Sequence, residues 1–205
     1  MLEALNLESV RGRRTLFREI SFSLKSGELL RVAGANGSGK TSLLRILCGL
    51  LSPTGGAVRW RGNPISGLRE DYFRQLVYVG HAAAVKDELT ASENLAIACR
   101  IAGNGRSGKE IREALQRFGL PEGEVLLKKL SQGQRRRAAL ARLALSESTP
   151  LWLLDEPFAA LDAAAARLVE ELIAQHVARG SIVVYTTHQE ARIQGARVLD
   201  LEAAA

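Results

Sequence analysis

The sequence of 205 residues is poor in cysteine and has no long apolar run. Its two cysteines, Cys48 and Cys99, form no C-x-x-C pair, so neither a disulfide framework nor a cysteine metal site is expected. No segment approaches the ~20 uninterrupted apolar residues of a membrane-spanning helix. The first residues include Glu3 and Glu8 and lack the basic-then-apolar pattern of a signal peptide. We therefore expect a cytoplasmic chain with buried, reduced thiols.

Acidic residues are in the minority, with 22 Asp and Glu against 28 Lys and Arg, for a net charge of +6. Such an excess fits nucleic acid or an anionic membrane surface as a partner. It equally fits a solvated basic surface with a site for a polyanionic nucleotide. We favour the second interpretation because several basic residues fall within the motifs below.

Short apolar segments alternate with helical ones along the chain. Strands are predicted over residues 15–24, 29–33, 57–60, 76–79, 151–154, 181–186 and 198–201. Helices are predicted over residues 40–50, 90–102, 109–118, 131–146 and 162–179. Strand, helix and strand joined by short loops predict a parallel sheet covered on both faces. The helical middle, roughly residues 82–146, is predicted to be a lobe inserted into this α/β core.

A glycine-rich loop before the helical segment 40–50 matches the pattern G-x-x-x-x-G-K-[ST]. Glycines allow the tight turns that aim backbone N–H groups at phosphate oxygens, and the following helix adds its N-terminal dipole. Lys40 can reach the β- and γ-phosphates of a nucleotide, and the Thr41 hydroxyl can ligate Mg²⁺. The sequence therefore predicts an ATP and Mg²⁺ site formed by Gly34, Ala35, Asn36, Gly37, Ser38, Gly39, Lys40 and Thr41.

Two carboxylates, Asp155 and Glu156, end the apolar segment 151–154. In α/β sheets ligands lie at the carboxyl ends of the strands, so Asp155 is expected to hold Mg²⁺ directly or through water. Glu156 is the predicted general base that polarises a water in line with the γ-phosphate. Ordinary surface acids could also end a strand, but the phosphate loop upstream favours the catalytic interpretation.

The segment Leu130-Ser-Gln-Gly-Gln134 precedes three arginines and a helix, and it resembles the LSGGQ signature of ABC ATPases. Its third residue is Gln rather than Gly. Ser131, Gly133 and the start of the helix offer a hydroxyl, backbone N–H groups and a dipole to an anion. Ser131 and Gln134 also match a capping box, which is compatible with that role. In this family the signature faces the γ-phosphate of the other subunit. The resemblance therefore implies that Ser131, Gly133 and Gln134 contact ATP across a head-to-tail pair.

Two further motifs follow in the order of this family. Asp162 lies in Phe158-Ala-Ala-Leu-Asp162, which resembles the D-loop that carries contacts across the pair. His188 resembles the switch histidine that contacts the γ-phosphate, and with Lys40 and Glu156 it completes the implied catalytic set. The resemblance implies a single nucleotide-binding domain over residues 1–205. The implied fold of this domain is that of an α/β P-loop NTPase of ABC type: a mixed or parallel sheet core, an N-terminal antiparallel β subdomain and the inserted helical lobe.

Two positions depart from the family pattern. Counting back from residues 90–94 places His81 where the family carries a Gln at the junction of core and helical lobe. An imidazole could bind a metal-bound water or the γ-phosphate, so His81 is a candidate nucleotide contact. The aromatic residue that stacks on adenine is absent near the N-terminus. Arg11 is the candidate by position, because a guanidinium can stack on a base.

Within the ABC ATPases, the chain resembles the ATP-binding subunits of cytochrome c maturation systems, also described as haem exporters. The resemblance rests on the segments Tyr78-Val-Gly-His81, Lys86-Asp-Glu-Leu-Thr-Ala91 and Leu151-Trp-Leu-Leu-Asp-Glu-Pro-Phe158. It implies two copies beneath integral membrane subunits, peripheral on the cytoplasmic face of the bacterial inner membrane. ATP-driven strokes would act indirectly on a haem-binding chaperone.

Three alternatives differ in the partner or in the chemistry. An ABC subunit of another transporter has the same catalytic residues and a different membrane partner. A non-transport ABC ATPase acting on nucleic acid or ribosomes is mildly favoured by the charge of +6. Such proteins usually carry two cassettes or long coiled coils, so no nucleic acid partner is expected. A regulator with a degenerate site is disfavoured by the presence of Lys40, Asp155, Glu156 and His188.

Overall fold

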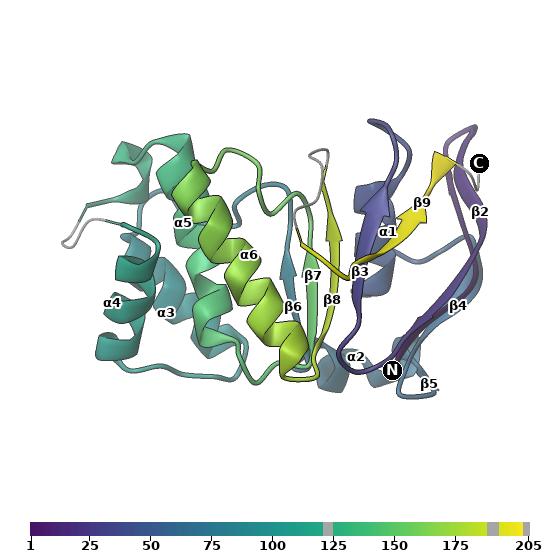
Figure 1. Ribbon diagram of the computed structural model, residues 1–205, viewed down its shortest axis with the longest axis horizontal. Coiled ribbons are helices and arrows are strands. Elements are labelled where there is room, and N and C mark those ends of the chain that lie inside the picture. Colours follow the sequence, from purple (N-terminus) through teal and green to yellow (C-terminus); the bar gives the residue numbers. More distant parts are fainter. Residues whose placement is uncertain (121–124, 188–192, 203–205) are drawn as a thin grey trace.

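A computed structural model describes residues 1–120, 125–187 and 193–202 (Figure 1). The strands are β1 (Leu2–Arg11), β2 (Arg14–Leu24), β3 (Leu29–Ala33), β4 (Gly55–Trp60), β5 (Asn63–Pro64), β6 (Leu76–Val79), β7 (Leu151–Leu154), β8 (Ile182–Thr186) and β9 (Arg197–Asp200). The α-helices are α1 (Lys40–Leu47), α2 (Ile65–Phe73), α3 (Ala91–Ile101), α4 (Gly108–Arg117), α5 (Gln132–Leu140) and α6 (Ala163–Ala178). Short 3₁₀ helices are η1 (Leu127–Lys129) and η2 (Ala141–Leu145).

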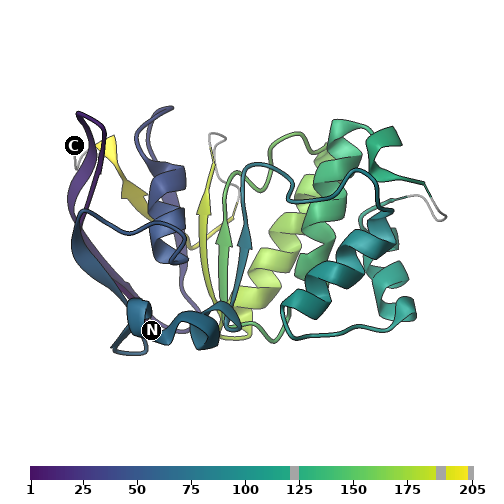
Figure 2. The same cartoon turned by 180° about the vertical axis from the view of Figure 1, so that it is seen from behind.

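The N-terminal strands form a 4-stranded antiparallel sheet in the order β2-β1-β4-β5. Along β1 the buried residues Leu2, Ala4 and Leu7 share a core with α1, while the residues between them are more exposed. An antiparallel sheet with one face on a core and one toward solvent shows this alternation. The sheet stands beside the rest of the molecule and covers α1 from outside (Figures 1 and 2).

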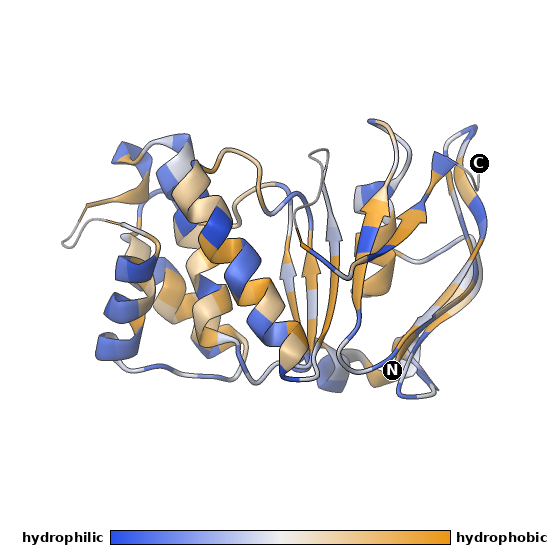
Figure 3. Ribbon diagram, viewed as in Figure 1, coloured by the Kyte–Doolittle hydropathy of each residue, from blue (hydrophilic) through white to orange (hydrophobic). Residues whose placement is uncertain are grey.

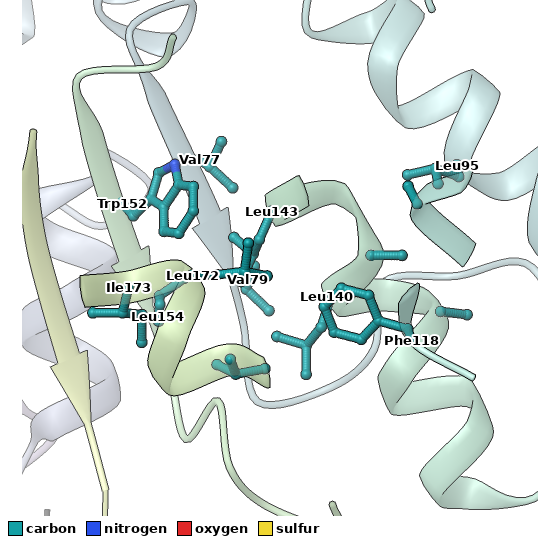
Figure 4. Packing of buried hydrophobic residues seen from close by; sticks show 14 of the residues in the cluster. Val77, Val79, Leu95, Phe118, Leu140, Leu143, Trp152, Leu154, Leu172 and Ile173 are labelled. Atoms are coloured by element: carbon teal, nitrogen blue, oxygen red, sulfur yellow. The ribbon is translucent and has the colours of Figure 1, made fainter. Parts of the chain in front are cut away.

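The central sheet is parallel and 5-stranded, in the order β6-β7-β8-β3-β9. Every residue of β7 is buried, because its side chains alternate between two cores. Leu151 and Leu153 pack in the core with α1, whereas Trp152 and Leu154 pack in the core with α6. Figure 4 shows Trp152 and Leu154 beside Ile173 of α6. The sheet is thus covered on both faces, which explains its nearly continuous apolar strands.

The helices α3, α4 and α5 follow β6 and precede β7 in the chain, and they gather at one end of the molecule (Figure 2). Capping boxes begin all three of them, with Thr90, Ser107 and Ser131 as the N-caps. Much of α4 is coloured hydrophilic in Figure 3, and its buried residues join the core that reaches α6. Across the described ranges, no helix combines the length and apolar character that spanning a bilayer demands.

The predicted α/β class is confirmed, including the antiparallel N-terminal sheet and the parallel core. Three details differ. The helix predicted over residues 40–50 ends at Leu47, because Gly49 adopts a left-handed φ of 77° that a helix cannot contain. The helix predicted over residues 131–146 is α-helical only to Leu140 and continues as the 3₁₀ helix η2. Strands β1 and β5 and helix α2 were not predicted.

Candidate active site

The phosphate loop connects β3 to α1, and Lys40 is the first residue of that helix. Its Nζ donates hydrogen bonds to the carbonyls of Gly34 (2.7 Å) and Ala35 (3.0 Å), and the residue is only 7% exposed. Gly39 is the N-cap of α1 with φ 103°, and a Cβ there would lie 3.0 Å from the Phe17 ring, so both its conformation and its surroundings require glycine. The loop therefore presents a buried cation beside a helix N-terminus, an arrangement that attracts a polyanion.

Asp155 connects the acidic pair to the phosphate loop. The Thr41 hydroxyl donates to its Oδ2 (2.8 Å), and the buried Thr186 hydroxyl donates to its Oδ1 (2.9 Å). Thr41 and Asp155, the two predicted Mg²⁺ ligands, thus lie side by side. No group of three or more His, Cys, Asp or Glu side chains is gathered for a metal ion among the described residues. One hydroxyl and one carboxylate fit Mg²⁺, which usually keeps several waters and takes the remaining ligands from phosphate.

Glu156 follows Asp155 on a turn at the carboxyl end of β7. Its φ of 49° lies in the left-handed region, which costs a non-glycine residue about 1–2 kcal/mol. Two side chains hold this turn: the Glu156 N–H donates to Thr186 Oγ1 (2.8 Å), and Arg136 Nη2 donates to the Glu156 carbonyl (2.7 Å). Strained backbone persists where its surroundings determine it in this way. Glu156 itself is 8% exposed.

Arg136 approaches the acidic pair from α5. Burial lowers the pKa of its guanidinium, and the nearby carboxylates of Asp155 and Glu156 oppose that effect. The sequence contains three consecutive arginines here, and nothing in the pattern distinguishes the one that turns inward.

The signature segment has the local structure of a helix cap. The Gln134 N–H donates to Ser131 Oγ (3.2 Å) and the Ser131 N–H donates to Gln134 Oε1 (2.9 Å), so the capping box is formed. Gly133 faces the segment before α6: a Cβ there would lie 3.0 Å from the Ala160 carbonyl. Asp162 is the N-cap of α6, with its Oδ1 accepting from the Ala165 N–H (2.8 Å). The signature and D-loop residues are therefore neighbours within one chain.

These two segments lie apart from the phosphate loop of the same chain. In Figures 1 and 2 strands of the parallel sheet stand between the start of α5 and α1. The structure thus brings together Lys40, Thr41, Asp155 and Glu156, and it gathers Ser131, Gly133 and Asp162 elsewhere. One chain alone does not bring the signature residues to its own phosphate loop.

Two further predicted contacts, Arg11 and His81, are exposed. Arg11 is exposed at the end of β1, while Arg14 of the same hairpin lies beside the phosphate loop, with Nη1 3.8 Å from a Cβ built on Gly37. His81 is exposed after β6, and its backbone carbonyl accepts from Arg136 (3.2 Å). His188 lies outside the described residues.

Sequence reasoning missed Thr186, Arg136, Arg14 and Glu202. Glu202 Oε1 accepts a hydrogen bond from the Ala35 N–H in the phosphate loop. Pairing of β9 with β3 brings it there, which no local motif indicates.

The chain is similar to known proteins over most of its length. The model of the ABC transporter family matches residues 17–159. The cytochrome c biogenesis ATP-binding export protein CcmA of Nitrosospira multiformis is 50% identical over 202 residues, covering 98% of each chain. The protein of the same name from Pseudomonas aeruginosa is 46% identical over 204 residues, covering 99% of this chain and 100% of that one.

Solved structures have the same fold. A dimeric ATP-binding cassette in a post-hydrolysis state, bound to ADP and Pi, has a TM-score of 0.84 and 26% identity, covering 98% of this chain and 94% of that one. An ABC transporter ATP-binding protein from Pyrococcus furiosus has a TM-score of 0.83 over 100% of this chain and 98% of that one. At 23% identity, the second comparison shows the fold alone.

Proposed function

The chain belongs to the ABC transporter family and is therefore an ATPase, and we propose that it serves as the nucleotide-binding subunit of a membrane complex for cytochrome c biogenesis. The observation that carries the catalytic part is the 2.8 Å hydrogen bond from the Thr41 hydroxyl to Asp155, which joins the phosphate loop to the acidic pair. The names of relatives that are 46–50% identical over nearly the whole chain support the cytochrome c part.

The phosphate loop is the proposed binding site of the ATP phosphates. Lys40 supplies a buried cation for the β- and γ-phosphates, at present hydrogen-bonded to carbonyls of the loop. The Ser38 hydroxyl is buried without a hydrogen-bond partner in the described part of the chain. Buried polar groups without partners are uncommon, so this hydroxyl supports a loop shaped for a ligand. Gly34, Asn36, Gly37 and Gly39 would contribute backbone N–H groups, and so would Ala35 once its N–H leaves the Glu202 carboxylate.

Thr41 and Asp155 are the proposed Mg²⁺ ligands. The ion, when bound, would neutralise phosphate charge and orient the oxygens of the nucleotide. Thr186 holds the second oxygen of Asp155, so that Oδ2 stays directed at Thr41. Such support of a ligand by a buried hydroxyl fixes its geometry before the substrate arrives.

Glu156 is the proposed general base for the attacking water. General bases contribute about 10²–10⁴-fold to the rate, provided that they lie within hydrogen-bond reach of the proton. The turn that carries Glu156 is fixed by Thr186 and Arg136, which sets the direction of its side chain. His188 and His81 are proposed contacts to the γ-phosphate, and Arg11 to the adenine.

Two copies of the chain would complete the site. Ser131, Gly133 and Gln134 lie away from the phosphate loop of their own chain, so their proposed nucleotide is the one bound by a second copy. The dimeric cassette bound to ADP and Pi supports a paired arrangement. Asp162 beside the signature segment is a proposed contact across the pair.

A groove of about 620 Å³ beside β6 is the proposed docking surface for the membrane subunits. Leu50, Phe73, Ile97 and Ile101 all line it, and Ile101 is 83% exposed. Contiguous exposed apolar side chains of this kind mark interaction sites. Tyr78 also lines the groove, two residues before Gly80, so a partner seated here would lie close to the loop that carries His81. The chain would then be peripheral on the cytoplasmic face of the inner membrane.

Membrane fractions test both parts of the proposal. The tagged chain, extracted with detergent, should co-purify with integral membrane subunits and a haem-binding chaperone, and it should hydrolyse ATP. Lys40→Ala should abolish hydrolysis. Ile101→Glu should lose the membrane subunits but keep ATP hydrolysis. Val198→Glu, which changes another exposed apolar residue (55% exposed) on β9, should lose neither.

Other results would redirect the assignment. Permease subunits of another kind would keep the ATPase and replace the cytochrome c context. Ribosomes or nucleic acid in their place would move the chain to the non-transport ABC proteins. Full ATPase activity in Lys40→Ala would remove the phosphate-loop assignment.

A further inference from the structure

Arg136 is a buried cation that binds backbone rather than a carboxylate. The residue is 5% exposed, and its guanidinium donates four hydrogen bonds to carbonyl oxygens. Nη1 reaches Gly80 (2.8 Å) and His81 (3.2 Å) after β6. Nη2 reaches Asp155 (2.9 Å) and Glu156 (2.7 Å) after β7. One side chain of α5 therefore joins the carboxyl ends of two neighbouring strands.

These carbonyls belong to the segments that carry the proposed chemistry. The Asp155 N–H already donates to the Val79 carbonyl (2.7 Å), which ties the two strand ends together once. Arg136 links them again through the carbonyls of Gly80 and His81 on one segment and of Asp155 and Glu156 on the other. Charge-assisted hydrogen bonds are about twice as strong as neutral ones, so the link is stiff.

The backbone of Glu156 depends on this link. Its left-handed φ of 49° is unfavourable for a side chain of this kind, and it needs partners on both sides of the peptide. Thr186 holds the N–H of Glu156, and Arg136 holds its carbonyl. Without the guanidinium, the Asp155 carbonyl loses this buried donor and the Glu156 carbonyl keeps the N–H of Ala159 (3.1 Å), so the turn is held by one partner fewer.

We propose that Arg136 is a positioning residue for ATP hydrolysis, which fixes the turn that directs Glu156 and holds the loop of His81 beside it. The inference rests on the proposed function and adds a residue to it. Arg136 acts through the backbone carbonyls that it binds. Its loss should therefore slow the chemical step and spare ATP binding, which depends on Lys40 and the phosphate loop.

At this position arginine differs from lysine in the geometry of its donors and not in its charge. A guanidinium presents five N–H donors in a planar fork, whereas an ammonium has three donors on one nitrogen. Lysine at this position keeps the positive charge near Asp155 and Glu156 but cannot reach both pairs of carbonyls with one fork. Arg136→Lys thus separates the fork from the charge.

Arg135 provides a matched control on the same helix. Its guanidinium donates to the carbonyls of Lys128 (2.9 Å) and Leu130 (3.2 Å) and pairs with Asp87 (3.1 Å), away from the acidic pair. Arg135→Gln removes the same charge one residue away. The full-length wild type, Arg136→Lys, Arg136→Gln, Arg135→Gln and Lys40→Ala are compared by kcat for ATP, by the Kd for ATP from calorimetry and by Tm.

Arg136→Lys is expected to lower kcat at least about tenfold, since displacing a catalytic group by about 1 Å costs about 100-fold. Its Kd for ATP should stay within about twofold of wild type, as should both constants of Arg135→Gln. A wild-type kcat in Arg136→Lys would overturn the proposal, and so would an equal loss in Arg135→Gln or a Kd that rises as much as kcat falls. Arg136→Lys decides the matter if Arg136→Gln fails to fold. A wild type no more active than Lys40→Ala would instead refute the proposed function.

Discussion

Acidification should lower the stability of the fold through the buried imidazole of His176 on α6. Its ring stacks on the Trp152 indole with centroids 3.7 Å apart and planes 13° apart, and the residue is 1% exposed. Burial lowers the pKa of His176 from 6.5 to about 4, because the charged imidazolium loses its hydration. The folded protein therefore keeps this imidazole neutral over a range of pH in which the unfolded chain protonates it.

The free energy of unfolding should fall with pH in a defined window. Since the folded pKa lies below the unfolded one, the unfolded chain binds the proton first, and stability decreases from pH 6.5 down to about pH 4. Each pKa unit is worth 1.36 kcal/mol, so the full effect is about 3 kcal/mol and about 2 kcal/mol is already lost at about pH 5. Below the folded pKa this group contributes no further change.

Urea unfolding of wild type and His176→Phe across this window isolates the effect. Phenylalanine preserves the stacked aromatic contact with Trp152 and does not titrate. The exposed His81 and all carboxylates are common to both proteins, so they cancel in the difference. The stability of wild type relative to the variant should fall by about 2 kcal/mol between neutral pH and about pH 5. Parallel pH profiles for the two proteins would refute the burial argument.

Three other substitutions or treatments test the site and the core. Thr186→Val removes the hydroxyl that joins the two acidic residues, so it should destabilise the fold by about 1–3 kcal/mol and lower kcat for ATP more than it raises the Kd; an unchanged kcat would contradict this. Gly133→Ala places a Cβ 3.0 Å from the Ala160 carbonyl, so ATP hydrolysis should fall. The Tm should change little, because alanine has the better helix propensity. Full activity would show that the segment before α6 can shift freely. The thiol of Cys48, whose pKa burial raises to about 11, should react with a thiol reagent only after denaturant is added; labelling of the native protein at this residue would refute its burial.

Sequence patterns predicted the elements that carry a local signal. The strands β3 and β7 are short apolar runs ended by a glycine-rich loop and by two acids, and both are where the pattern placed them. The end of α1 carries a local signal as well, Gly49, but Leu50 continues the apolar helical pattern beyond it, and the pattern alone placed the end too late. Only the left-handed backbone of Gly49 ends the helix at Leu47. Apolar periodicity by itself does not fix such a boundary, whereas a glycine just past the helix does.

The residues of the candidate site also fall into those that a sequence pattern predicts and those that it does not. Lys40, Thr41, Asp155 and Glu156 could be predicted because their residue types and spacing follow from phosphate and metal chemistry. Arg136 could not, since it is one of three adjacent arginines. The packing of α5 against the sheet decides that this one is 5% exposed.

The central claim is that two copies hold ATP between them until Glu156 activates water, and one measurement tests it directly. Glu156→Gln keeps the phosphate loop and removes the base, so it should bind MgATP and retain it. In saturating MgATP its molar mass by light scattering should double from the 22.2 kDa of one chain, with unhydrolysed ATP in the dimer. A Glu156→Gln variant that binds ATP but stays at the mass of one chain, or that converts its ATP to ADP at the wild-type rate, would contradict the account.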